Sequence, residues 1–325
     1  MPKNSAYPLL VILLVTCFIA KTQAQQLSYE KLAIEGGYRF EYQWLDHNKI
    51  RQNIAFTLTQ AGLFDRFRYF KSYHSEYAQK TIIRRIKQQM QQNPIEGVQI
   101  AYEKADKFSV RAYGQDKKKV ADAYEQITLI QQKITQAYLK EIYYQEFTNH
   151  QQITAIKVDH ASIANDSVHD LKPLKPIILD VVSIQNPREV TNFIVSFVQS
   201  IPYNKLQSRL TSSGAGFNPP LKLLWENQGD CDSKMTLTAA LLRALMPRIK
   251  MMLIYIKEHA FIGINIPAKP GEMTIRHDNI TYLLADPTGP ALLPVGIVGA
   301  ESELAIVQGQ YSIQRFHELL TPKPN

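Results

Sequence analysis

Three residues in the second half of the chain have the types and the setting that covalent acyl transfer requires. Cys231 follows Gly229-Asp230 and precedes a run of good helix formers that ends before Pro247, so the sequence predicts a helix that begins at the cysteine. The unpaired backbone N–H groups and the positive dipole end at a helix start favour a thiolate, the nucleophilic form of cysteine. Cys231 is therefore the candidate nucleophile.

A thiol nucleophile also needs a base, and the base needs a group that orients it. His259 stands at the start of the apolar, β-branched segment 260–266, and Asp286 directly follows a similar segment, 280–285. The polar turn between these segments predicts an antiparallel pair, in which the start of one strand lies beside the end of the other. We therefore expect Cys231, His259 and Asp286 to act as nucleophile, general base and orienting carboxylate.

Attack on a carbonyl carbon creates an oxyanion that needs hydrogen-bond donors. The backbone N–H of Cys231 is the natural first donor, and the side chains of Trp225 and Gln228 are candidates for the second. The other histidines are scattered among polar residues and show neither H-x-x-x-H nor H-E-x-x-H spacing. The sequence therefore predicts no metal site, and it predicts no cofactor.

Three separated segments that carry these residues match a known pattern. They read GDCDSK (229–234), HAF (259–261) and ADPTGP (285–290), and FVQSIPY (197–203) precedes them. In this order they resemble the transglutaminase-like superfamily, especially bacterial exported members with a GDC…H…D/E-x-T-G-P pattern. The resemblance covers residues 187–298, about a third of the chain.

The resemblance implies a papain-like α+β core, in which the cysteine helix packs on an antiparallel sheet, with a triad at Cys231, His259 and Asp286. It implies a cysteine peptidase that hydrolyses a peptide or isopeptide amide through a thioester on Cys231. The superfamily also contains amine-acceptor transglutaminases and members without catalysis. A cross-linking enzyme and a non-catalytic peptide-binding or scaffold protein therefore remain as alternatives.

The first 24 residues have the pattern of an export signal. Lys3 precedes the uncharged apolar run 9–20, and Thr22-Gln23-Ala24 offers a small-x-small cleavage site. We expect cleavage after Ala24 and a periplasmic or secreted protein. The alternative is a lipoprotein acylated on Cys17, although a threonine stands where a smaller residue usually precedes such a cysteine. Removal of the leader would leave Cys231 as the only cysteine, which excludes an internal disulfide.

The remainder of the chain divides by composition into three parts. We predict an N-terminal α/β region of unknown role (25–165), a proline-containing linker (166–186) and a transglutaminase-like domain (187–325). Within the N-terminal region the patterns predict a strand at 38–44, a helix at 75–92, a hairpin from 98–102 and 108–113, and a long helix at 116–147. The apolar stripe of the long helix is expected to pack within its own region.

Composition and charge exclude several classes of protein. The 325 residues contain 45% hydrophobic residues, two cysteines, and 37 Lys and Arg against 29 Asp and Glu, which is typical of a folded chain and not of a disordered or disulfide-rich one. The basic clusters at 84–87 and 117–119 lie on predicted helices rich in Gln and Glu, so we assign them to solvated faces and not to nucleic-acid binding. No apolar run after the leader is long enough to span a membrane, and the predicted partner is a protein or peptide substrate.

Overall fold

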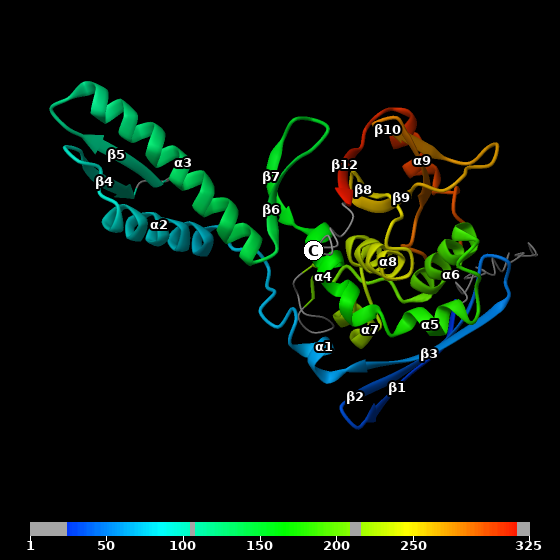
Figure 1. The fold of residues 1–325 in the computed structure, drawn as a ribbon. Helices are drawn as coiled ribbons and strands as arrows, with labels where there is room; N and C mark the ends of the chain where they lie inside the picture. Colours follow the sequence, from blue (N-terminus) through cyan, green and yellow to red (C-terminus); the bar gives the residue numbers. More distant parts are fainter. Residues whose placement is uncertain (1–24, 105–107, 209–215, 317–325) are drawn as a thin grey trace, which may run out of the picture.

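The computed structural model describes residues 25–104, 108–208 and 216–316 and shows a mixed α+β fold with antiparallel sheets. Figure 1 shows a body that contains both ends of the described chain and an arm, residues 75–141, that projects from it. The predicted signal peptide, with the alternative anchor Cys17, lies outside the described residues.

One sheet of the body carries the strands that were predicted to hold the histidine and the aspartate. In the described residues it is five-stranded and antiparallel, in the order β10-β11-β9-β8-β12. Its strands are β8 (Met251–Ile256), β9 (His259–Ile264), β10 (Thr274–His277), β11 (Ile280–Ala285) and β12 (Ser312–Phe316). Asp278 and Asn279 have φ of 48° and 61° and form the tight turn between β10 and β11. The predicted antiparallel pairing of β9 with β11 is confirmed.

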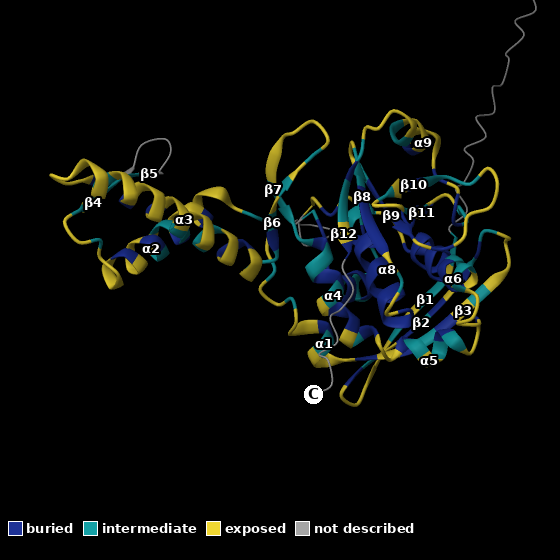
Figure 2. Ribbon diagram, turned by 45° about the horizontal axis from the view of Figure 1, so that its top comes forward, coloured by how far each residue is buried: buried dark blue, intermediate teal, exposed yellow. Residues whose placement is uncertain are grey.

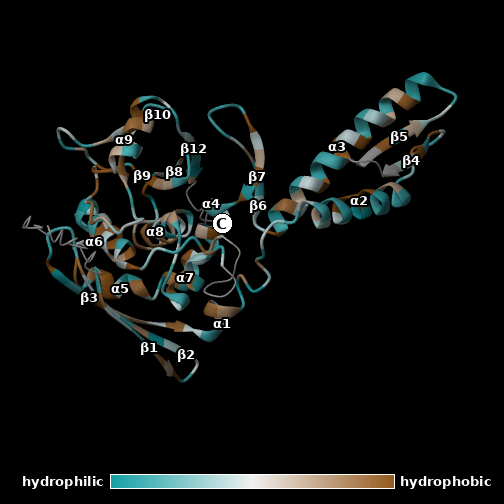
Figure 3. Cartoon of the chain, turned by 180° about the vertical axis from the view of Figure 1, so that it is seen from behind, coloured by the Kyte–Doolittle hydropathy of each residue, from teal (hydrophilic) through white to brown (hydrophobic). Residues whose placement is uncertain are grey.

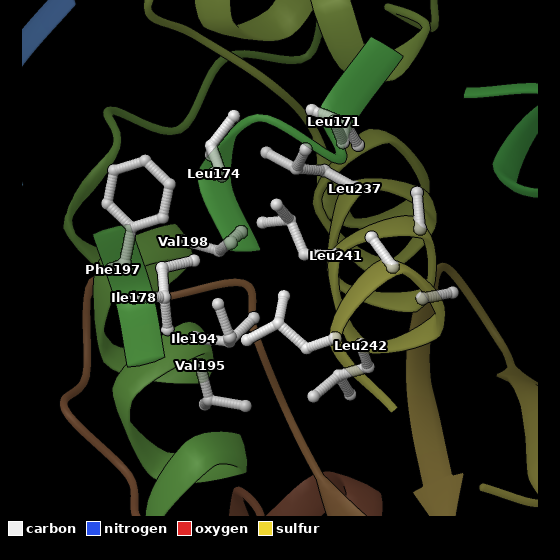
Figure 4. Packing of buried hydrophobic residues seen from close by; sticks show 14 of the residues in the cluster. Leu171, Leu174, Ile178, Ile194, Val195, Phe197, Val198, Leu237, Leu241 and Leu242 are labelled. Atoms are coloured by element: carbon white, nitrogen blue, oxygen red, sulfur yellow. The ribbon is translucent and has the colours of Figure 1, made fainter. Parts of the chain in front are cut away.

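The cysteine helix, α8 (Cys231–Leu245), runs through the centre of the body, and each of its residues from Ser233 onward is buried. It packs against β9 and against α4 (His160–Leu171), α6 (Pro187–Ser200) and α7 (Pro220–Glu226). Figure 4 shows Leu237, Leu241 and Leu242 of α8 facing apolar side chains from the neighbouring helices. Each such side chain contributes roughly 1.5–3 kcal/mol by leaving water, which holds the first turn of α8 in place.

A second sheet, from the start of the described chain, joins the same core. It consists of β1 (Gln26–Ile34), β2 (Gly37–Leu45) and β3 (Arg51–Thr59), and α1 (Gln60–Phe64) follows it. Alternate residues of β2 face inward, so that Tyr42 and Trp44 are buried and contact the ring of Phe197 at 5.0 and 5.3 Å between ring centroids. This sheet shares one hydrophobic core with α6 and α8, and the predicted separation of region 25–165 from the second half is therefore wrong for these strands.

The predicted linker at 166–186 is also wrong, because most of it is helical. It contains the end of α4 and the short helix α5 (Leu174–Leu179), and Leu171, Leu174 and Ile178 are fully buried. Pro173 occupies the N-cap of α5, where a missing backbone N–H costs no helical hydrogen bond. The two prolines that suggested a linker thus mark the start of a packed helix.

The arm has its own small core. It consists of α2 (Ser75–Gln92), the hairpin β4 (Gln99–Lys104) and β5 (Phe108–Tyr113), and α3 (Lys117–Glu141). The apolar stripe of α3 packs as predicted, because Ala123 and Ile127 are buried against Ile86 and Met90 of α2. Outside this narrow core the arm is largely exposed, as Figure 2 shows.

The predicted long helix ends six residues earlier than expected. After Glu141 the chain leaves the helical region, since Tyr143 has φ of 60°, and it continues as the hairpin β6 (Tyr144–Thr148) and β7 (Thr154–Val158). Aromatic residues at the end of the predicted helix pack as strand residues against the body, where the Phe147 ring lies 5.4 Å from the Tyr255 ring. This hairpin connects the arm to the body (Figure 1).

The surface of the arm is polar along most of its length, as the hydropathy colouring in Figure 3 shows. Lys117, Lys118 and Lys119 are exposed at the start of α3, as expected for a solvated helix face. In the part of the chain that the structure describes, no helix combines the length and the apolar character needed to cross a bilayer.

We predict that Trp44→Ala lowers the free energy of unfolding of the whole body by about 3–5 kcal/mol. The substitution removes a fully buried ring from the shared core together with the hydrogen bond from Trp44 Nε1 to Ser196 Oγ. Chemical denaturation followed by circular dichroism and by the fluorescence of the remaining Trp225 measures the change. Leu129→Ala, at an exposed site on α3, is the control and should change stability by less than about 0.5 kcal/mol. An unchanged midpoint for Trp225 in the Trp44 variant would contradict the shared core.

Candidate active site

The structure confirms that Cys231 is the first residue of α8, and the cap explains why. Asp230 has extended backbone angles, and its side chain accepts hydrogen bonds from the backbone N–H of Ser233 at 2.9 Å and from the Ser233 hydroxyl. An acidic N-cap satisfies one of the free N–H groups of the first turn and opposes its positive dipole end. The local sequence thus places the thiol at the start of a buried, capped helix.

The segment that leads into α8 is held by close backbone packing. The Gly229 N–H donates to Pro202 O, and Gly229 O accepts from the Asn204 N–H, so the segment pairs with residue 203 like a short strand. A side chain on Gly229 would bring its Cβ within 2.6 Å of Leu223 Cδ1. A larger residue here would have to displace the buried Leu223 side chain, so glycine allows the segment before the cysteine to pack closely.

The structure brings His259 and Asp286 together as predicted. His259 begins β9 and Asp286 follows the last residue of β11, whose Ala285 lies opposite Ile262. The Nε2–H of His259 donates to Asp286 Oδ2 at 2.7 Å. This bond uses one ring nitrogen of His259 and leaves Nδ1 as the nitrogen that can exchange a proton with a neighbouring group.

The Asp286 carboxylate is fixed by further contacts. Its second oxygen accepts from the Thr288 N–H at 3.0 Å, and its backbone carbonyl accepts from Gln199 Nε2 at 2.7 Å. The following turn needs glycine at position 289, where φ is 64° and a Cβ would lie 2.5 Å from Gln199 O. The ADPTGP segment therefore forms a tight support for the carboxylate.

Cys231 lies near the start of β9, because α8 packs against this strand and the backbone N–H of Ala260, the residue after His259, acts to lower the pKa of the thiol. Burial, with the nearby charges of Asp232 and Asp230, nevertheless raises the pKa of Cys231 to about 12. The thiolate expected from the helix start alone is therefore disfavoured. The main reason is burial, which disfavours the charged form, and the two carboxylates at the same helix end add to it by counteracting the backbone dipoles.

The pKa values of the other two residues favour a charged pair. Burial alone would lower the pKa of His259, but its hydrogen bond to Asp286 and the charges of Asp286, Asp232 and Glu301 outweigh burial and raise it. Burial would raise the pKa of Asp286, but the bond to His259 and the hydrogen bonds from Thr288 outweigh it and lower the pKa. The pair is therefore stable as imidazolium and carboxylate.

The structure separates the two oxyanion candidates. The Trp225 ring packs between Tyr38 and Phe64, at 4.6 and 4.9 Å between centroids, and Lys31 Nζ lies 3.4 Å above it. Trp225 thus faces the N-terminal sheet and is set aside as a donor. Trp225 faces away from the thiol because Asn227, which ends α7 in a left-handed conformation (φ 51°), turns the chain before it reaches Cys231.

Gln228 stays a candidate, because it lies three residues before the thiol and its amide is oriented. Gln228 Oε1 accepts from Asn204 Nδ2 at 2.9 Å, so the amide nitrogen is held on the other side of the group. That nitrogen is 3.4 Å from Glu226 Oε2. Its role as a donor in the reaction is not tested by these contacts and stays a prediction.

Sequence reasoning missed a buried cluster next to the thiol. His160 is 2% exposed, its Nε2 is 3.6 Å from Asp232 Oδ2, and its Nδ1 is 3.2 Å from Thr236 Oγ1. Lys157 Nζ lies 3.0 Å from the centre of the Tyr255 ring, and burial lowers the pKa of this amine to about 7 against the opposing charges of Asp232 and Asp159. The only local sequence feature that indicated this cluster was Asp232, the acidic residue after Cys231. The approach of β7 to α8 depends on tertiary packing.

Within the described ranges, no group of three or more His, Cys, Asp or Glu side chains is arranged to hold a metal ion. Comparisons of the chain with known protein families, with curated proteins and with solved structures find no significant match.

We predict that His259→Gln destabilises the protein more at pH 5.5 than at pH 9. A histidine whose pKa is raised on folding contributes stability fully below its unfolded pKa of about 6.5, and this contribution is lost as the pH rises through the folded value. We expect the difference between the two pH values to be about 1–2 kcal/mol, as for a hydrogen bond to a charged group. Denaturant titrations at both pH values measure it. His169→Gln, whose side chain is 79% exposed, is the control, and an equal loss at both pH values would contradict the charged pair.

Proposed function

We propose that this protein is an exported cysteine-dependent acyl-transfer enzyme that hydrolyses a peptide or isopeptide amide through a thioester on Cys231. The observation that carries the proposal is the 2.7 Å bond from His259 Nε2 to Asp286, at the start of the strand that packs against the cysteine helix. A papain-like core of the transglutaminase-like type is part of the proposal, and it is supported by the cysteine helix that packs on β9 of an antiparallel sheet.

The raised pKa of Cys231 determines how the thiol would react. With so high a pKa, Cys231 is a neutral thiol before the substrate binds. Its proton must therefore pass to His259 Nδ1 while the sulfur attacks the substrate carbonyl carbon. Asp286 holds the ring in the required tautomer and stabilises the imidazolium that forms. His259 then returns the proton to the leaving amine, and the C–N bond breaks to leave a thioester on Cys231.

The second half of the reaction repeats these roles with water. His259 removes a proton from water as the oxygen attacks the thioester, and the thiol is regenerated when the C–S bond breaks. An amine in place of water would give transfer, which is the transglutaminase alternative. The backbone N–H of Cys231 and the amide of Gln228 are the proposed oxyanion donors.

A cavity of about 650 Å³ beside the turn that precedes His259 offers room for a substrate side chain. Lys157, Tyr255, Ile256 and Glu301 are among the residues that line it. Ile256 is the cross-strand partner of His259, so the cavity lies one strand away from the base, and neither His259 nor Cys231 lines it. A mixed apolar and charged lining of this size supports a peptide as the bound partner.

We predict that iodoacetamide alkylates Cys231 with a rate that rises with pH through the pKa of His259, which lies above 6.5, and not through a thiol pKa near 12. Below this midpoint the ring carries a proton and cannot act as a base. His259→Ala should therefore lower the alkylation rate at pH 8 by at least about tenfold. The measurement is the mass of the Cys231-containing peptide over time between pH 5 and pH 10.

His169→Ala is the matched control for this experiment, because that ring is exposed and far along the chain from the site. It should leave the rate and the midpoint unchanged. If His259→Ala and the wild type have the same profile, the histidine is not the base and a non-catalytic binding role is favoured instead. If Cys231 reacts through His259, the Cys231→Ser variant can then be incubated with cell-envelope proteins to capture its substrates.

A further inference from the structure

A second buried amine lies one helical turn after the nucleophile. Lys234 of α8 has no exposed surface, although lysine is almost never fully buried without a partner. Its position three residues after Cys231 puts it on the same helix face, toward the interior. The roles of the triad do not use this side chain, so its burial needs an explanation.

The contacts of Lys234 join three parts of the site. Its Nζ donates to Ile201 O at the end of α6 and to Thr288 O after β11, each at 2.5 Å. Thr288 in turn donates its backbone N–H to Asp286 Oδ1 at 3.0 Å. The helix that carries the thiol is thereby connected through one amine and the backbone of one residue, Thr288, to the carboxylate that orients His259.

The charged groups that face this amine are two carboxylates, Asp286 from the loop after β11 and Asp230 from the N-cap of α8. Burial lowers the pKa of Lys234 to about 7, and both carboxylates oppose that shift. A buried amine is costly, and an apolar side chain of the same length would fill this space without that cost. Its retention beside two acids points to an electrostatic role.

We propose that Lys234 is a positioning residue, which holds the Asp286 loop against α8 and keeps the Asp286 carboxylate ionised beside His259. The hydrogen bonds to Thr288 O and the proximity to Asp286 carry this inference, and it rests on the proposed function for its catalytic meaning. Lys234 acts through Asp286 and does not touch the reacting atoms.

The test compares Lys234→Met with Arg243→Met, a matched control at the other end of the same helix. Arg243 is equally buried and donates to the backbone carbonyls of Pro247, Ile249 and Phe316, so its loss removes a buried cation held by carbonyls outside the triad. The pKa of Asp286 is followed by NMR of protein labelled with ¹³C in the aspartate carboxyl groups. The signal is assigned with Asp286→Asn.

We expect Lys234→Met to raise the pKa of Asp286, because a nearby opposite charge and the anchor of the Thr288 carbonyl have been removed. The rate of Cys231 alkylation at pH 8 should fall at least about tenfold, because the histidine is no longer held in place. Arg243→Met should change neither quantity, although both variants lose stability. An Asp286 pKa that is the same in Lys234→Met and in the wild type overturns the proposal.

If Lys234→Met does not fold, the proposal is tested by the reciprocal measurement, which is the pKa of Lys234 in the Asp286→Asn variant. Two groups that interact shift each other's pKa, so Asp286→Asn must lower the pKa of Lys234, followed by NMR of protein labelled with ¹³C at the lysine Cε. An unchanged Lys234 pKa overturns the proposal in the same way. Failure of this inference can be told apart from failure of the proposed function. If His259→Ala leaves the alkylation rate of Cys231 unchanged, the proposed function is wrong. If His259→Ala lowers that rate but Lys234→Met leaves the pKa of Asp286 unchanged, only this inference is wrong.

Discussion

The hydrogen bond between His259 and Asp286 is the interaction on which the arrangement of the site depends. A carboxylate that is only 8% exposed must be paired or protonated, because an isolated buried charge is costly. The antiparallel register of β9 and β11 supplies the imidazole, and the turn after β11 supplies the Thr288 N–H. Any change in that register would leave a buried acid without its partner, so the energetics of folding and the geometry of the site select the same pairing.

The N-terminal sheet has a structural part in positioning the nucleophile, although it lies more than 170 residues away in sequence. The Tyr42 hydroxyl donates to Leu224 O, and Lys31 Nζ donates to Trp225 O, so strands β1 and β2 hold the end of α7. The chain passes from there through four residues to Cys231. The sheet thus supports the loop that delivers the cysteine, which gives residues 26–45 a role that their distance along the chain conceals.

Charged groups of both signs, most of them partly buried, lie around the thiol. Asp230 and Asp232 disfavour the thiolate, while Lys157 and Lys234 lie near these and other acids and offset part of the cost of burying them. A cysteine kept neutral in this way reacts slowly with oxidants, since oxidation proceeds through the thiolate. In the exported enzyme that we propose, the carboxylates that keep the thiol neutral would protect it from oxidation between turnovers and make its reactivity depend on His259.

The sequence by itself determined the local elements of the site. The capped helix at Cys231, the strands that carry His259 and Asp286, and their antiparallel pairing all follow from periodicity and turn residues that act over a few positions. Tertiary structure alone decided that residues 166–186 are packed helices, that Trp225 faces the N-terminal sheet, and that the thiol is neutral. Burial and charge proximity are set by segments distant in sequence, and no local pattern encodes which of them will meet.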